Sequence, residues 1–185
     1  MVLGQVIAKL NNKTLDSALF DIMVEAGMRE TVYKPTVAPN LIVPSSYNKG
    51  TVRGMPANKI ANFLGGVAGN AGMFSIIDNI GAYMQLLLNK GKMHLSSRVF
   101  SEEVVDAVTT KVVVKGYNNT RALGWDTVPA VDPPCGSKFS KNSFGFSDPL
   151  GSYVWADKDK NISIVMLVAN GYPVQSAIPH AKAQG

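Results

Sequence analysis

Apolar residues recur at helical spacing in four segments within the first 110 positions of the chain. In the first segment, residues 2–10, apolar side chains return every three or four positions, as on one face of an amphipathic helix. The other segments begin at residues that favour N-caps, and two of them end at glycines that favour helix termination. They run from Thr14 to Gly27, from Ser75 to Gly91, and from Ser101 onward. The pattern therefore predicts helices at these positions.

A proline-containing stretch, residues 33–64, separates the second expected helix from the third. Proline lacks a backbone N–H and fixes φ, so this stretch is expected to form neither a continuous helix nor a central strand. Its prolines are Pro35, Pro39, Pro44 and Pro56. A connection of this length is either a functional loop over a site or a segment without regular structure.

Beyond residue 110 the helical periodicity gives way to short β-branched and apolar runs. These runs predict strands at 111–115, 122–127, 151–156 and 162–169, and the polar residues 157–161 make the last two a β-hairpin. Helices followed by antiparallel strands are typical of an α+β fold. We expect one domain over residues 1–172, mainly helical at 2–110 and built of antiparallel strands at 111–170, with a tail at 173–185.

The composition argues against several classes of function. The chain has 18 Lys and Arg against 13 Asp and Glu, a net charge of +5. Its lysines are scattered and do not interleave with aromatic residues, so no nucleic-acid partner is expected. No apolar run approaches the roughly 20 residues of a membrane-spanning helix, so no membrane span is expected. Cys135 is the only cysteine, and His94 and His180 are far apart in sequence, so we expect no metal and no cofactor.

Two short motifs imitate the catalytic set of serine acyl enzymes. Ser46 and Lys49 have the Ser-x-x-Lys spacing, which brings a base or proton relay to a nucleophile when both residues share a helix face. A proline precedes this motif and a glycine follows it, so no helix is expected there. The Tyr-x-Asn spacing of Tyr117 and Asn119 falls in a turn-like stretch between two expected strands. We therefore interpret both motifs as coincidences of spacing.

Four stretches, taken in order, carry a likeness to a known family. They are the helix pair ending in Gly-Met-Arg-Glu-Thr within residues 2–31, the Gly-rich loop and helix at 65–88, the Leu-Gly-Trp run at 123–125, and residues 143–155. Together they resemble the C-terminal half of the β-lactamase-related serine hydrolase family. That family includes class C β-lactamases, penicillin-binding-protein-like D-alanyl-D-alanine carboxypeptidases and several esterases. The resemblance implies a partial fold of that kind, and acyl transfer through a Ser-x-x-Lys helix, a Tyr-x-Asn loop and a Lys/His-Thr-Gly strand.

The third of these motifs maps onto degenerate residues. In ungapped register Phe146 takes the Lys/His position, Ser147 the Thr position and Asp148 the Gly position, and Pro149 follows. Phe146 has no cation or hydrogen-bonding group, and Asp148 is expected to repel a carboxylate of a substrate. The resemblance implies that the backbone N–H after the motif helps to bind the oxyanion, and proline has none. The alternative interpretation is that residues 148–151 are simply a turn.

These observations favour an inactive family member, since the Ser-x-x-Lys and Tyr-x-Asn elements are expected upstream of residue 1. Two alternatives stay open. One is a non-catalytic module that binds a small molecule, a peptide or a partner in the inherited cleft, and the other is an enzyme completed by a separate upstream segment. A sheet without its remaining strands is also expected to expose an edge and an apolar face, which favours instability or self-association. The sequence assigns neither a substrate nor a localisation.

Overall fold

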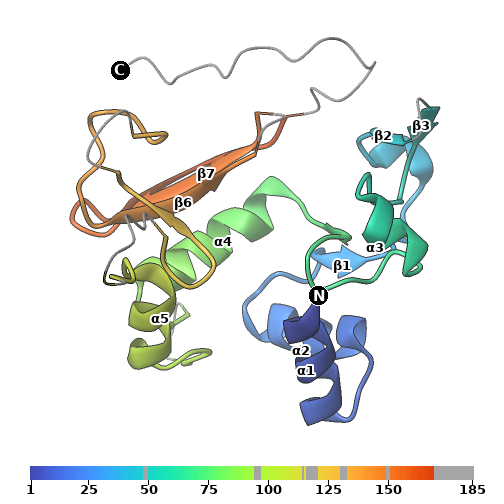
Figure 1. Ribbon diagram of the computed structural model, residues 1–185, viewed down its shortest axis with the longest axis horizontal. Helices are drawn as coiled ribbons and strands as arrows, with labels where there is room; N and C mark the ends of the chain where they lie inside the picture. Colours follow the sequence, from blue (N-terminus) through green and yellow to red (C-terminus); the bar gives the residue numbers. More distant parts are fainter. Residues whose placement is uncertain are drawn as a thin grey trace. The chain divides into compact units, whose positions relative to one another are not determined.

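The computed structural model describes residues 1–47, 50–93, 97–113, 115, 121–129, 133–148 and 151–168. These residues form two compact units. The first runs from Met1 to Ile80 and the second from Gly81 to Val168, so that the boundary falls within one helix, α4 (Ile77–Leu88). Figure 1 shows the elements of both units, coloured along the sequence.

The first unit begins with the predicted helix pair, α1 (Val2–Asn11) and α2 (Leu15–Glu25). Gly4 lies where α1 crosses other backbone, because a Cβ at this position would stand 2.9 Å from Leu15 Cδ2 and 3.0 Å from the Cα of Gly69. The close approach between α1 and the Gly-rich loop therefore requires glycine. Gly27 follows α2 with a φ of 75°, which is the helix-ending conformation predicted for it.

The proline-containing stretch contains only short elements, as its prolines lead one to expect. They are β1 (Val32–Tyr33), the 3-10 helix η1 (Pro39–Leu41), β2 (Ser45–Tyr47), β3 (Gly50–Val52) and α3 (Lys59–Phe63). Strands β2 and β3 pair as a hairpin, while β1 pairs antiparallel with β4 (Met73–Phe74), which follows the Gly-rich loop.

One predicted helix cap is wrong. Helix α4 begins at Ile77, so Ser75 lies one position before the N-cap. The Ser75 hydroxyl lies 2.7 Å from the hydroxyl of Thr31, which also accepts a 3.2 Å hydrogen bond from Asn79 Nδ2. Thr31 and Asn79 are both buried, so this cluster satisfies polar groups that connect the end of the helix pair to the start of α4.

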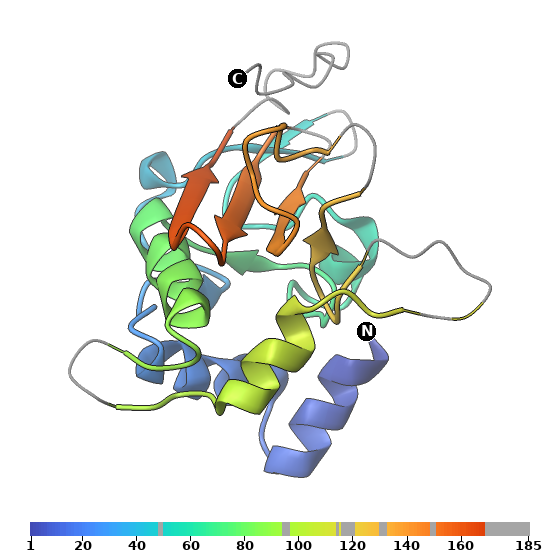
Figure 2. The ribbon, with the colours of Figure 1, turned by 90° about the vertical axis from the view of Figure 1, so that its left-hand side faces the viewer.

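The second unit holds a four-stranded antiparallel sheet in the order β5-β6-β7-β8, visible side by side in Figure 2. Its strands are β5 (Asp126–Thr127), β6 (Ser143–Ser147), β7 (Tyr153–Asp157) and β8 (Ile162–Met166). One face packs against α4 and α5 (Glu102–Thr109), and its buried core consists of Met84, Leu87, Val105, Phe144 and Ala156. Ser101 caps α5 as predicted, since its side chain accepts a hydrogen bond from the N–H of Val104.

Two strand predictions need correction. None of the described residues within 111–115 lies in a strand, although the N–H of Val112 donates to the carbonyl of Arg121. Of residues 122–127 only the last two form a strand, because Gly124 has a φ of 109° and turns the chain immediately before it. β-branched composition favours extended backbone, but pairing decides whether a strand forms. None of the helices among the described residues combines the length and the hydropathy that spanning a membrane requires.

Candidate functional site

The candidate site is the end of β6, which carries the residues that the sequence analysis maps onto the third motif. In the antiparallel register Gly145 pairs with Trp155, Phe146 with Val154 and Ser147 with Tyr153. Because side chains alternate along a strand, Ser147 shares its face of the sheet with Trp155. Phe146 lies on the opposite face, toward the helices, and 42% of it is exposed to solvent. The motif positions therefore lie on both faces of one strand.

Ser147 is held by a buried tryptophan. The indole Nε1 of Trp155 donates a 3.1 Å hydrogen bond to the hydroxyl oxygen of Ser147, and Trp155 is fully buried. Gly145 makes room for this indole, because a Cβ there would stand 2.3 Å from the carbonyl oxygen of Val154 and 2.4 Å from the Trp155 ring. The Ser147 hydroxyl keeps its own proton to donate, so it can still bind an acceptor.

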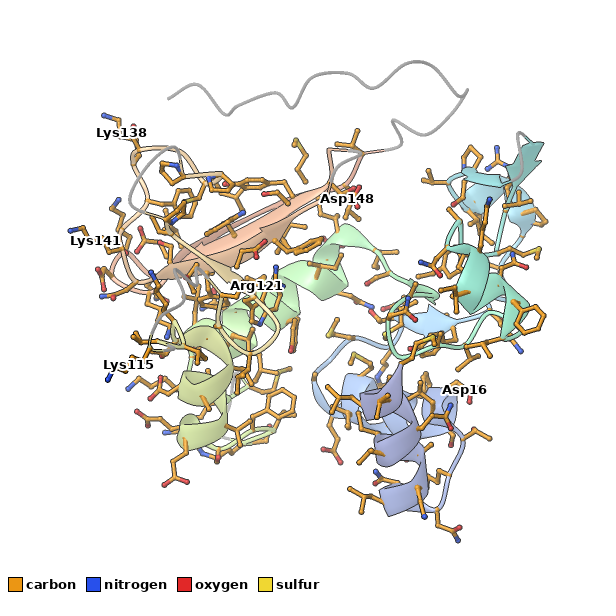
Figure 3. All side chains as sticks on the ribbon, in the orientation of Figure 1. Asp16, Lys115, Arg121, Lys138, Lys141 and Asp148 are labelled. Carbon is orange, nitrogen blue, oxygen red and sulfur yellow. The ribbon has the colours of Figure 1, made fainter. Side chains whose placement is uncertain are left out.

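Asp148 lies in a turn directly after β6. Its N–H donates to the carbonyl of Ser152 at 2.8 Å, and its carbonyl accepts from the N–H of Gly151 at 2.9 Å. Figure 3 places Asp148 at the end of the sheet remote from Lys138 and Lys141. The sequence interpretation of residues 148–151 as a turn therefore agrees with the described backbone at both ends of this segment. Pro149 lies outside the described residues.

The face of the sheet that holds Trp155 also holds a buried carboxylate, Asp157, beneath the preceding loop. Asp157 accepts hydrogen bonds from the Ser140 N–H at 2.8 Å, from the Ser140 hydroxyl at 2.7 Å, and from the N–H groups of Asp159 and Lys160. Burial alone would raise the pKa of Asp157, but the hydrogen bonds from Ser140 and from the turn outweigh it and lower the pKa to about 2. Asp157 is therefore an ionised structural group at neutral pH.

Two further titratable groups lie near this face. Burial raises the pKa of Tyr153 to about 12, and the thiol of Cys135 adds to this shift. Burial also raises the pKa of the Cys135 thiol, of which only 3% is exposed. Both groups are protonated at neutral pH, so neither is an activated base or nucleophile. Cys135 is thus an ordinary cysteine without catalytic activation, and its burial was not predicted from the sequence.

The imitation motifs do not form an acyl-enzyme site among the described residues. Ser46 lies in strand β2 opposite Thr51, not on a helix, which confirms the reason for rejecting Ser-x-x-Lys there. Lys49, Tyr117, Asn119 and both histidines lie outside the described residues. Within the part of the chain that the structure describes, no three His, Cys, Asp or Glu side chains are grouped as metal ligands.

The sequence interpretation did not identify a cavity in the first unit. It has a volume of about 230 Å³ and lies between α2 and the β1–β4 pair, with Asp16, Phe20, Tyr33 and Met73 in its wall. A hydrogen bond from Thr14 is the main reason why the pKa of Asp16 is lowered. The sequence carries no motif for this cavity, because its walls come from segments distant along the chain.

Comparison with known proteins identifies the family. The Beta-lactamase family model matches residues 1–184. An Escherichia coli O157:H7 protein described as a candidate D-alanyl-D-alanine carboxypeptidase is 27% identical over 188 residues, covering 90% of this chain and 42% of that protein. The N-acetylmuramyl-L-alanine amidase of Bacillus subtilis (strain 168) is 24% identical with the same coverage. The chain thus spans less than half the length of these curated relatives.

Solved structures agree on the fold. A β-lactamase from Mycobacterium bovis matches with a TM-score of 0.59 and 18% identity, covering 91% of this chain and 53% of that one. The hydrolase EstCE1, described as having promiscuous acyltransferase activity, matches with a TM-score of 0.62 and 15% identity, covering 91% and 49%. The helices and antiparallel sheet therefore resemble β-lactamase and penicillin-binding-protein structures. The chain belongs to the β-lactamase family.

Proposed function

We propose that this chain is the third-motif half of a β-lactamase-family domain in which that motif no longer supports efficient acyl transfer to a serine. The proposal is carried by the sequence at the end of β6, where we map Phe146, Ser147 and Asp148 onto the Lys/His, Thr and Gly positions. Gly145, Gly151 and Trp155 fix the register of this comparison. The family chemistry is hydrolysis or transfer of amide or ester acyl groups through a serine ester.

The three replacements differ in what they remove. Ser147 keeps a hydroxyl, and Trp155 orients it through the 3.1 Å hydrogen bond. Phe146 offers only an aromatic ring, so it cannot donate to a substrate carboxylate or relay a proton. Asp148 brings a carboxyl group to the turn that follows. Two unit charges of like sign about 4 Å apart repel by roughly 1 kcal/mol in water and 4 kcal/mol at a partly buried surface. Anionic substrates are therefore disfavoured.

The test is covalent labelling of the full chain. We would incubate it with a fluorescent penicillin and with a fluorophosphonate, and measure intact mass and the site of any adduct. No adduct is expected, and hydrolysis of a chromogenic cephalosporin should equal that of a buffer control. Ser46→Ala is the matched variant, because Ser46 has the only Ser-x-x-Lys spacing in the chain. Turnover, or labelling that Ser46→Ala abolishes, would overturn the proposal.

A non-catalytic binding module is the second candidate. The observation that favours it is the 42% exposure of Phe146, an aromatic side chain at a motif position that would otherwise be polar. Calorimetry with a D-alanyl-D-alanine peptide separates the two candidates, since saturable binding without an adduct supports the module. Asp148→Asn should then tighten binding of this carboxylate ligand several-fold by removing the like charge. Self-association through an exposed edge of the sheet is a further proposal, and it does not involve the ligand surface at Phe146.

A further inference from the structure

The cavity of the first unit, between α2 and the β1–β4 pair, has a volume of about 230 Å³. Asp16 and Phe20 are four positions apart on α2, so they share one face of that helix. Tyr33 and Met73 pair directly across β1 and β4, so their side chains share one face of this two-stranded sheet. The cavity is smaller than the roughly 300–1,000 Å³ typical of sites for drug-sized molecules, so it suits a smaller ligand.

Asp16 contributes a negative charge to the wall of this cavity, and Figure 3 labels it. The carboxylate is ionised at neutral pH, because its pKa is lowered, most of all by a hydrogen bond from Thr14. The charge of Lys34 lowers the pKa further, but none of the ion pairs between described residues includes Asp16. The Lys34 side chain runs along Gly66 instead, where its Cε would lie 3.6 Å from an added Cβ. Within the described part of the chain, no cation therefore contacts the Asp16 carboxylate.

Two aromatic rings and a thioether line the cavity beside this carboxylate. The hydroxyl of Tyr33 donates a 2.9 Å hydrogen bond to the carbonyl of Ala68, which fixes the position of its ring. Burial is the main cause of the raised pKa of Tyr33, and the charge of Asp16 adds to it, so the ring and the carboxylate lie within electrostatic range of each other. Phe20 and Met73 are 43% and 39% exposed, so the described core does not use up their apolar surface. Aromatic faces attract cations, and the methionine sulfur is polarizable.

We propose that this cavity binds a small organic ammonium ion, whose charge lies against Asp16 and whose alkyl groups lie against the rings of Phe20 and Tyr33. An anion would be repelled by Asp16, and a neutral apolar molecule would remove water from this carboxylate without replacing its hydrogen bonds. A metal ion is not favoured, because no three His, Cys, Asp or Glu side chains are grouped as ligands among the residues that the structure describes. The proposal concerns the first unit alone and needs no acyl-transfer chemistry.

The first test is calorimetric titration of the full chain with choline, a small quaternary ammonium ion. Saturable binding at one site is expected, with a dissociation constant of about 1 mM. The matched probe is dimethylbutanol, which has the shape of choline but carries a neutral carbon in place of the nitrogen. It should bind about tenfold more weakly, because it gains no attraction from Asp16 or from the ring faces. Equal affinity for the two probes, or no saturable binding of choline, would overturn the proposal.

The second test identifies the residues that bind choline. Asp16→Asn keeps the shape of the side chain but removes its charge, and it should raise the dissociation constant about tenfold. Phe20→Leu keeps an apolar side chain but removes the ring, and it should raise the constant about two- to fivefold. Asp21→Asn is the matched control, because Asp21 lies on the same helix but already pairs with Lys13, so the affinity should not change. Far-ultraviolet circular dichroism shows whether each variant is folded. The proposal is wrong if folded Asp16→Asn and Phe20→Leu bind choline as wild type does, or if Asp21→Asn weakens binding as much as Asp16→Asn.

Discussion

Asp157→Asn tests how much the buried carboxylate stabilises the second unit. The replacement keeps the shape of the side chain, but it removes the negative charge and turns one acceptor oxygen into an NH2 group. That group would face hydrogen-bond donors, which now include the N–H of Ser140 at 2.8 Å and its hydroxyl at 2.7 Å. Hydrogen bonds to charged groups contribute about 1.5–3 kcal/mol each, and losing a partner for a buried donor costs a similar amount.

The pKa of Asp157 sets an independent scale for this effect. It falls from 3.8 to about 2 on folding, and each pKa unit corresponds to about 1.4 kcal/mol, which gives at most about 2.5 kcal/mol. Because the folded pKa lies below the unfolded pKa, this stabilisation is fully present well above pH 3.8 and is lost as the pH falls toward 2. Asp157→Asn should therefore lower the free energy of unfolding by about 2 kcal/mol at pH 7, and by much less near pH 2.

The assay is urea denaturation of wild type and variant from pH 7 to pH 2.5, followed by tryptophan fluorescence. Both tryptophans of the chain, Trp125 and Trp155, lie in the second unit, so the signal reports on the unit that contains Asp157. Asp159→Asn is the matched control. Its exposed carboxylate accepts a 3.0 Å hydrogen bond from Asn142, and its loss should cost less than about 0.5 kcal/mol. If the difference in free energy of unfolding between wild type and Asp157→Asn stays constant from pH 7 to pH 2.5, the reasoning is refuted.

Three further predictions each rest on the surroundings of a single residue. Gly145→Ala should lower the free energy of unfolding by about 3 kcal/mol in chemical denaturation, because its Cβ would meet the Trp155 ring and a strand carbonyl. Cys135 should react with an aromatic disulfide reagent only on unfolding, since burial raises its thiol pKa and covers the sulfur. Thr31→Val should cost about 1–3 kcal/mol by thermal melting, because it leaves Asn79 without the hydroxyl it donates to.

Each of these expectations has its own control. Gly81→Ala is the control for Gly145→Ala, because a Cβ on this helical glycine meets nothing within 4 Å. This variant should be neutral or slightly stabilising. Thiol modification in native buffer at the rate seen in urea would show that the loop does not protect Cys135. For the Thr31 cluster, Thr31→Ser keeps the hydroxyl, so an equal loss in both variants would assign the effect to packing instead.

The helices were the part of the fold that could be predicted best from the sequence. Three turns of periodic apolar residues define α4, and the Ser101 cap of α5 could be located from local chemistry alone. The strands β1, β2, β3 and β4 were missed because two or three residues are too few to show an alternating pattern. The predicted strand at 111–115 had suitable residue types, but none of its described residues lies in a strand. Pairing is a tertiary property that composition does not encode.

The same limit applies to the candidate site. The order of the residues maps the proposed third motif onto the end of β6, but it did not show that Trp155 holds the hydroxyl of Ser147. That bond depends on the cross-strand register between β6 and β7. The contact between Ser140 and Asp157 joins residues 17 positions apart and was equally hidden. The sequence proposes which residues depart from the family pattern, while the pairing of strands decides what each of them touches.

The register of β6 also shows that the residues proposed for the third motif have different surroundings. Ser147 shares a face with the buried Trp155, so its hydroxyl is fixed by packing that the sheet needs for stability. Phe146 lies on the other face and is 42% exposed, so packing in the core constrains it much less. Asp148 lies beyond the strand, where neither face of the sheet determines the residue. In the mapping proposed for residues 146–148, the residue that keeps a hydroxyl is therefore the one whose side chain the fold holds, through the hydrogen bond from Trp155.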